Sequence, residues 1–166
     1  MEHETTKFES TLMAVNENDT LKEILKILSY ASLFVCAYAF FYGAVILFLR
    51  EVMLGLFYVA TIALPFLLVS LIARALKAPT PRQLFDFYGA QKKTTYSFPD
   101  IPVFLCFAVG TLTLFTHFIL GLITLALALC LSVCRPLLGH AFPRDVVAGG
   151  LVGIACSLIG YFLMIL

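Results

Sequence analysis

The chain has 166 residues, of which 61% are hydrophobic and only 13% charged, with a formal net charge of +1 and a mean hydropathy of +1.00. A soluble domain is nearer half apolar and a quarter charged, so this composition excludes a soluble enzyme and a disulfide-rich secreted module. The near-neutral charge gives no support for nucleic-acid binding. Residues 101–134 contain no Asp, Glu, Lys or Arg, and about 20 apolar residues suffice for a helix to cross a bilayer. The sequence therefore predicts an all-α integral membrane protein.

The N-terminal segment differs from the rest of the chain. Residues 1–19 are acidic and polar and are predicted to form a short mobile tail. The segment has no apolar core, so it is not predicted to be a cleavable signal peptide. Thr20 and Glu23 have the spacing of a capping box, in which the two side chains satisfy backbone groups at a helix start. A helix is therefore predicted to begin at Thr20.

The apolar segments define the membrane spans. The uncharged stretch 101–134 would be roughly 51 Å long as one helix at about 1.5 Å per residue, which exceeds a hydrocarbon core of about 30 Å. We therefore expect it to turn near His117. Residues 20–166 are predicted to form one transmembrane domain with five spans, at about 28–49, 52–72, 101–117, 119–134 and 146–166. Two polar segments, 73–100 and 135–145, connect them.

Basic residues indicate the orientation in the membrane. With five spans, the N-terminal segment and the two polar segments lie on one side and hold ten of the eleven Lys and Arg residues, whereas Arg50 lies on the other. Basic residues favour the cytoplasmic side. The N-terminus and both polar segments are therefore predicted to be cytoplasmic.

The polar segments contain three suggestive runs of sequence. They read KAPTPRQLFDFYG from residue 77, YSFPDIPVFLCFAVGT from residue 96 and CRPLLGHAFPRDVVAGGLVG from residue 134. Over roughly residues 50–166 this pattern resembles the type 2 phosphatidic acid phosphatase superfamily, the lipid-phosphate phosphatases related to vanadium haloperoxidases, and small bacterial members above all. The resemblance implies a helix bundle whose two polar loops converge on one membrane face. Most members have that face outside the cytoplasm, in conflict with the orientation that the basic residues predict here.

The resemblance also implies a chemistry. In the family one imidazole attacks phosphorus and is oriented by a carboxylate, a second imidazole protonates the leaving alkoxide, and one Lys and two Arg neutralise the phosphate oxygens. Carried over to this chain, the nucleophile position is Ala141, the acid position is Pro102 and one arginine position is Thr80. Asp100 replaces a serine of the second motif. Loss of one member of such a group typically costs on the order of 10⁴-fold in rate, so a pseudoenzyme is predicted.

Two family positions are kept, those of the arginine (Arg135) and of the orienting carboxylate (Asp145). Two interpretations stay open. Arg135 could still hold a lipid phosphate, or the two residues could form an ion pair that locks the last loop. A carboxylate at Asp100 would repel phosphate unless it is paired with Arg135 or Arg74.

Further basic residues form a rim beside the motifs. Arg74, Lys77 and Arg82, with Arg135, are the candidate ligands for a lipid phosphate. Lys92 and Lys93 belong to the same basic rim, which ordinary positive-inside topology would also produce.

Two histidines admit alternatives. His140 stands one residue before the nucleophile position, so a shifted loop could restore catalysis and give an active phosphatase acting on phosphatidic acid or a polyprenyl (di)phosphate. His117 could be functional, as ionisable residues at membrane depth often are, or could reach the headgroups from its turn.

Small residues are expected to pack. The five cysteines lie in or at the ends of apolar stretches and form no CxxC pair, so neither a metal site nor a cofactor is predicted. Gly149 and Gly153 give the last span a small-residue face, expected to pack inside the bundle in preference to forming a dimer.

These features together predict a multi-pass protein of a bacterial cell membrane that has lost catalysis and acts in lipid-phosphate binding or as a membrane subunit. The expected partners are anionic or phosphorylated membrane lipids, with a protein partner or a homodimer left open. A small transporter or channel component is a third possibility, supported only by His117 and the uncharged spans.

Overall fold

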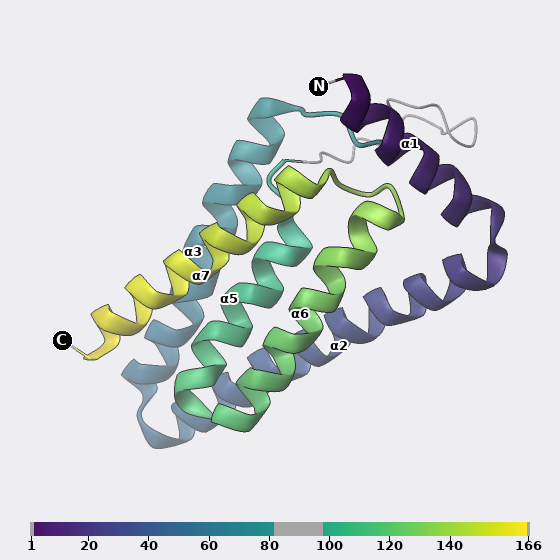
Figure 1. Cartoon of the computed structure of the whole chain (residues 1–166). Coiled ribbons are helices and arrows are strands. Elements are labelled where there is room, and N and C mark those ends of the chain that lie inside the picture. The colour runs from purple at the N-terminus through teal and green to yellow at the C-terminus, as the bar shows by residue number, and fades with distance from the viewer. Residues whose placement is uncertain (1, 82–97, 166) are drawn as a thin grey trace.

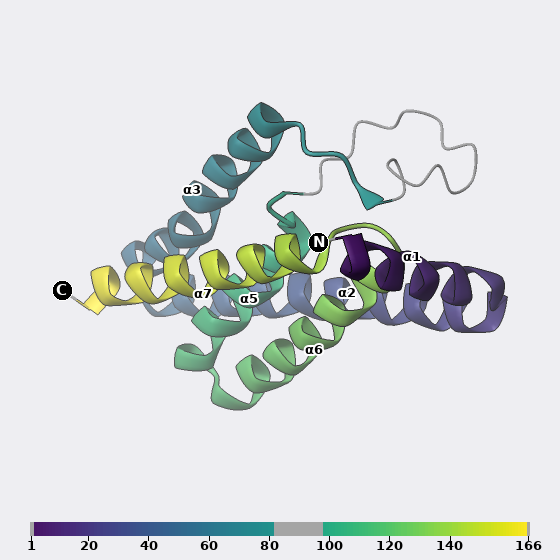
Figure 2. The same cartoon turned by 45° about the horizontal axis from the view of Figure 1, so that its top comes forward.

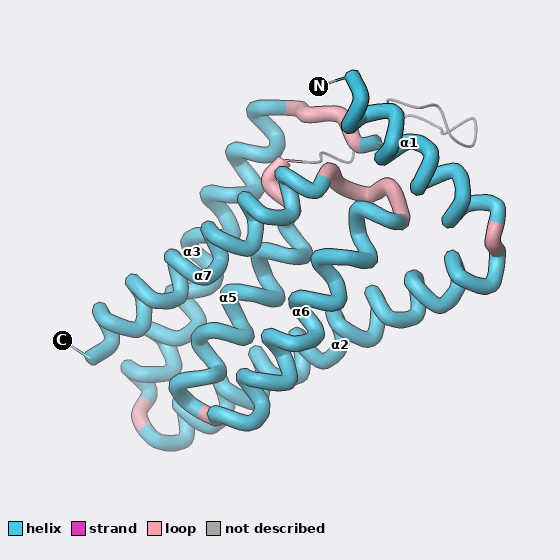
Figure 3. Tube along the Cα trace, viewed as in Figure 1, coloured by secondary structure: helices cyan, strands magenta, loops and turns pink. Residues whose placement is uncertain are grey.

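The computed structural model describes residues 2–81 and 98–165, and every regular element in these residues is an α-helix (Figures 1 and 3). The helices are α1 (Glu2–Glu17), α2 (Asp19–Arg50), α3 (Val52–Leu76), α5 (Ile101–Thr116), α6 (Phe118–Leu137) and α7 (Pro143–Ile165). Helices α2, α3, α6 and α7 are long and apolar enough to cross a membrane, and α5 is a shorter apolar helix. The chain is thus a polytopic membrane helix bundle, as its composition predicts.

Helix α5 is the centre of the bundle. It packs against α2, α3, α6 and α7, and the two views in Figures 1 and 2 show it among these helices. Nine of its 16 residues are buried, whereas the outer helices expose many large apolar side chains such as Phe34, Leu68 and Leu163. A soluble protein would not tolerate such a surface, but hydrocarbon solvates it.

The stretch 101–134 turns where the sequence predicts. Helix α5 ends at Thr116 and α6 begins at Phe118, with His117 alone between them. The backbone N–H of His117 donates to Thr113 O at 2.7 Å, and its carbonyl accepts from Gly121 N at 2.9 Å. One residue therefore closes one helix and opens the next.

The N-terminus differs from the predicted mobile tail, because residues 2–17 form helix α1. Val15 of α1 is buried in a cluster with Leu25, Cys134 and Leu138, and this contact with α2 and α6 stabilises a helix that its polar composition alone would not. The predicted helix start at Thr20 agrees with the structure to within one residue, but Asn18 and not Thr20 caps the helix. Helix α2 begins at Asp19, because the Asn18 side chain accepts a hydrogen bond from Leu21 N at 3.2 Å and caps the helix.

The small-residue face of α7 packs inside the bundle, as predicted. A Cβ atom on Gly149 would lie 2.7 Å from Asp100 O, and one on Gly153 would lie 2.5 Å from Phe104 O. One turn further on, Ser157 Oγ donates to a backbone carbonyl of α5 at 2.8 Å. Only small side chains allow α7 to approach the backbone of α5 so closely.

Candidate functional site

The described end of the first polar segment, residues 98–100, meets the second polar segment at one end of the bundle, where α5 and α7 begin and α6 ends (Figure 1). Arg135, in the last turn of α6, donates from Nε to Asp100 Oδ2 at 2.6 Å. The backbone N–H of Asp100 donates to Asp145 O, in the first turn of α7, at 3.3 Å. Asp100 therefore joins three helix ends, and the predicted convergence of the loops is confirmed.

The α6–α7 loop is shaped by local backbone rules. Gly139 has a φ of 69°, in the left-handed region that glycine adopts without a steric penalty. This turn lets the N–H of His140 donate back to Arg135 O at 3.0 Å, which satisfies a carbonyl at the helix end. Helix α7 then opens with Asp145 in its first turn, where the helix dipole favours a carboxylate.

Two buried carboxylates lie at this site, and the guanidinium of Arg135 is paired with one of them, that of Asp100. The side chain of Asp100 is 3% exposed and that of Asp145 is 2% exposed, whereas that of Arg135 is 18% exposed. Arg144 Nε lies 3.4 Å from Asp145 Oδ1, but its side chain is 83% exposed and extends into solvent. In the described structure the guanidinium of Arg135 is therefore already paired with a carboxylate, that of Asp100.

Burial has a further effect on Asp100. Removal of the carboxyl from water raises its pKa above the ordinary value, and the negative charge of Asp145 acts in the same direction. The charge and the hydrogen bond of Arg135 oppose this shift but do not cancel it. Arg135 is therefore the main group that stabilises the ionised form of Asp100.

The residues at the family positions predicted to have lost their function are buried or half-buried. Ala141, at the nucleophile position, is fully buried in the main apolar core with Leu131 and Val146. Thr80 is 4% exposed. Pro102 is half-buried at the start of α5, where proline fits because the first helical N–H groups have no partner in the helix.

The other candidate residues lie around this centre. His140 is half-buried beside Ala141. Arg74, in the last turn of α3, and Lys77, the residue that caps α3, are exposed. Arg82, Lys92 and Lys93 lie outside the described residues. Among the described candidates, the structure joins Arg135, Asp100 and Asp145 directly.

Helix α1 lies against the same end, which the sequence did not predict. The rings of Phe8 and Phe142 have centroids 6.0 Å apart, and Phe142 O accepts from Asp145 N at 2.9 Å. The available signal was the apolar spacing of Leu12 and Val15, both buried. Helix α1 thus covers part of the loop that carries Ala141.

No protein-family model matches the chain, and no curated protein matches it in sequence. Two solved structures resemble it. LpxE from Aquifex aeolicus has a TM-score of 0.65 and 21% identity over 91% of this chain and 92% of that chain. A transmembrane PAP2-type phosphatidylglycerolphosphate phosphatase from Bacillus subtilis has a TM-score of 0.58 and 17% identity over 96% of this chain and 92% of that chain. Both belong to the type 2 phosphatidic acid phosphatase superfamily, so the fold predicted from the motifs is confirmed.

Proposed function

Because the chain has the fold of the type 2 phosphatidic acid phosphatases, we propose that it is a catalytically inactive membrane protein of that kind, which acts as a lipid-binding membrane subunit. The observation that carries this proposal is the 2.6 Å ion pair between Arg135 and Asp100. In the family chemistry this arginine neutralises the substrate phosphate. Here the carboxylate of Asp100, which belongs to the chain itself, is already bound to this guanidinium.

The replaced positions support the same conclusion. Ala141 and Pro102 carry no nucleophile and no proton donor, and Ala141 is enclosed in the apolar core. Phosphoryl transfer through a covalent intermediate needs a nucleophilic atom that can reach phosphorus. A substrate would also have to displace Asp100 from Arg135 in a site that already holds two buried carboxylates.

Lipid binding is proposed for the rim instead of the centre. Arg74 and Lys77 are exposed at the end of α3, where basic side chains attract anionic headgroups with about 1 kcal/mol each. Arg82 belongs to the same candidate group by sequence. Arg135 would join them only after Asp100 has been displaced or protonated.

A phosphate-release assay tests inactivity. The purified chain in detergent should release no phosphate from phosphatidic acid or from a polyprenyl diphosphate above the level of an Arg135→Gln variant. Lipid binding is tested separately, by mass spectrometry of lipids that co-purify. The Arg74→Gln/Lys77→Gln variant should retain less anionic lipid than the wild type.

The rival function is an active phosphatase that uses His140. It predicts turnover that His140→Ala abolishes and that Arg135→Gln also abolishes. This pair of results would overturn the proposal. Activity that neither substitution changes would come from a contaminating enzyme and would leave the chain without measurable catalysis, as proposed.

A further inference from the structure

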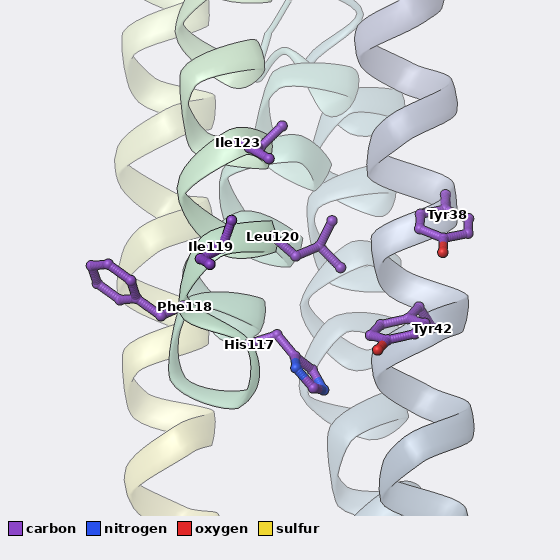
Figure 4. Close-up of a pocket in the computed structure, with 7 residues that line it drawn as sticks. All are labelled: Tyr38, Tyr42, His117, Phe118, Ile119, Leu120 and Ile123. Atoms are coloured by element: carbon purple, nitrogen blue, oxygen red, sulfur yellow. The ribbon is translucent and has the colours of Figure 1, made fainter.

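A second site lies at the opposite end of the bundle from the motif loops. A pocket of about 500 Å³ opens between α2 and the first turns of α6 (Figure 4). Its lining combines polar with apolar side chains: Tyr38, Tyr42, His117, Phe118, Ile119, Leu120 and Ile123. The volume is within the range of about 300–1,000 Å³ that is usual for small-molecule sites.

The polar groups gather at one end of this pocket. His117 and Tyr42 face each other across the gap between the two helices (Figure 4), with ring centroids 5.1 Å apart. Tyr38 lies one turn further along α2, with its ring stacked on that of Tyr42 at 5.9 Å. Leu120 and Ile123 continue the opposite wall along α6. The pocket therefore has a polar end and an apolar end, aligned with the helices.

The short length of α5 places the polar end within the length of α2 and not at its end. Tyr42, which lies level with His117, precedes the end of α2 at Arg50 by eight residues, or about 12 Å at 1.5 Å per residue. Within the described residues, the side chains of His117, Tyr38 and Tyr42 make ring contacts but no side-chain hydrogen bond. Unpaired donors are costly when hydrocarbon replaces water around them.

The surroundings identify the class of ligand. Tyr38 and Ile123 are 56% and 48% exposed on the outer surface of helices that cross the membrane, so the pocket faces lipid. An occupant must accept hydrogen bonds from an imidazole and from phenol hydroxyls, and must also offer an apolar chain to Leu120 and Ile123. None of the described residues that line the pocket is acidic, so an anionic group meets no repulsion from them.

We propose that this pocket binds an anionic phospholipid of the leaflet opposite the motif loops, with its phosphate at His117 and Tyr42 and one acyl chain along Leu120 and Ile123. The site is independent of the ion-paired centre and of any phosphatase activity.

The absence of tryptophan from the chain allows a direct test, because one introduced Trp is then the sole indole fluorophore. The reporter is Tyr38→Trp. The control is Phe41→Trp, which lies at nearly the same depth on α2, is 65% exposed and does not line the pocket. Both variants are reconstituted into phosphatidylcholine vesicles that contain increasing amounts of phosphatidylglycerol with brominated chains, which quench Trp on contact.

The reporter should be half-quenched at a mole fraction of brominated phosphatidylglycerol about tenfold lower than the control, as one charge-assisted hydrogen bond would give. Adding His117→Ala and Tyr42→Phe should move the reporter curve onto the control curve. A second reporter, Ile123→Trp, gives the same comparison from α6 if replacing Tyr38 disturbs the pocket.

Three results would overturn the proposal. Superimposed curves for both reporters and the control would show that no selective site exists. Equal selectivity for brominated diacylglycerol would show that the phosphate is not recognised. Protection of the reporter from quenching that increases with the protein-to-lipid ratio, together with a dimer in light scattering, would assign the pocket to a second copy of the chain.

Discussion

The carboxylate of Asp100 changes what its neighbouring arginine can do. A guanidinium binds a phosphate or a carboxylate with the same planar array of donors. In this chain the carboxylate is held in place by the fold, because the backbone of Asp100 also binds Asp145 O. Arg135 therefore already has a carboxylate partner within the chain, and this partner does not have to bind from solution.

Removal of Arg135 alone should lower the free energy of unfolding much more than removal of both Arg135 and Asp100. Arg135→Gln leaves the buried Asp100 carboxylate without its guanidinium, which should lower the free energy of unfolding at neutral pH by about 3–5 kcal/mol. Adding Asp100→Asn should restore most of that loss. The matched control is Arg144→Gln, which removes an exposed arginine beside a carboxylate and should cost less than about 1 kcal/mol. Denaturant unfolding in detergent micelles measures all four proteins, and equal losses for Arg135 and Arg144 would contradict the argument.

The raised pKa of Asp100 predicts a pH dependence with a definite sign. Over a range of pH above the ordinary Asp pKa, the folded protein keeps a proton on Asp100 that the unfolded chain has released. The free energy of unfolding should therefore fall as the pH rises from the ordinary Asp value, about 3.9, to the folded-state pKa. The comparison is wild type against Asp100→Asn across this range. A wild type that gains stability relative to the variant as pH rises would contradict the prediction.

The resemblance of the motifs predicts that Ala141 and Pro102 stand where the family has histidines, but it does not predict the contact between Arg135 and Asp100. It left the partner of Arg135 open between Asp145 and Asp100, because a pair separated by 35 residues depends on how α5 and α6 are placed. Tyr38 and Tyr42 were not singled out, although two tyrosines four residues apart in an apolar span share one helix face.

The contact between α5 and α7 depends on two glycines of α7 and not on a third. At Gly149 and Gly153 the nearest obstacles to a Cβ atom are backbone carbonyl oxygens of the α5 N-cap and of α5 itself. At Gly150 the obstacle is the Phe107 ring, 3.2 Å away. A side chain can rotate, but a helix backbone can yield only if the whole helix shifts. The position of a glycine along α7 therefore decides how much an added methyl group lowers the stability of the protein.

Alanine substitutions along α7 test this difference. Gly149→Ala and Gly153→Ala should each lower the free energy of unfolding by about 1–3 kcal/mol, as overpacking does. Gly150→Ala should change stability by less than about 1 kcal/mol, because the better helix propensity of alanine offsets the ring movement. Thermal unfolding in one detergent compares the three variants, and equal effects would show that α7 moves freely against α5.

Helix α1 shows why a polar segment can still be ordered. Its few apolar residues are spaced so that Leu12 and Val15 are both buried, and Val15 packs in one cluster with Cys134 and Leu138, which lie far from α1 in sequence. Composition alone indicates a polar segment and does not reveal the two buried side chains. Tertiary packing, however, contributes most of a helix's stability, so these two side chains can order the segment.

Detachment of α1 should expose Cys134. The Leu12→Asn/Val15→Asn variant removes the apolar contact and should make Cys134, now 2% exposed, react faster with a water-soluble thiol reagent in a Cys130→Ala background. Met13→Asn is the control, because Met13 lies on the same helix and is 43% exposed. Equal labelling rates in the two variants would mean that α1 does not cover this end.

The orientation of the whole molecule is predicted from its basic residues. The described part of the loop end carries Arg74, Lys77 and Arg144, whereas Arg50 lies at the opposite end. Positive-inside topology then puts the loop end in the cytoplasm. The helix bundle was predictable because hydropathy identifies its apolar helices. The orientation is not fixed by hydropathy and stays a prediction.

Cysteine labelling decides the orientation. In a background without the natural cysteines, Glu51→Cys in intact cells should react with a membrane-impermeant reagent, and Arg144→Cys should react only after permeabilisation. Both residues are exposed, so access depends on the side of the membrane and not on burial. Labelling at position 144 but not at 51 in intact cells would reverse the orientation and place the motif loops outside.

The enclosure of α5 has a consequence for how the protein matches its bilayer. A helix of 16 residues is about 24 Å long, shorter than a hydrocarbon core of about 30 Å. In contact with lipid, such a helix would force local thinning. Because its neighbours surround it, α5 is solvated by protein and imposes no hydrophobic mismatch. Lipids of different chain length should therefore change the tilt of α2 and α3 while leaving the packing around α5 unchanged, so the same centre can serve in membranes of different thickness.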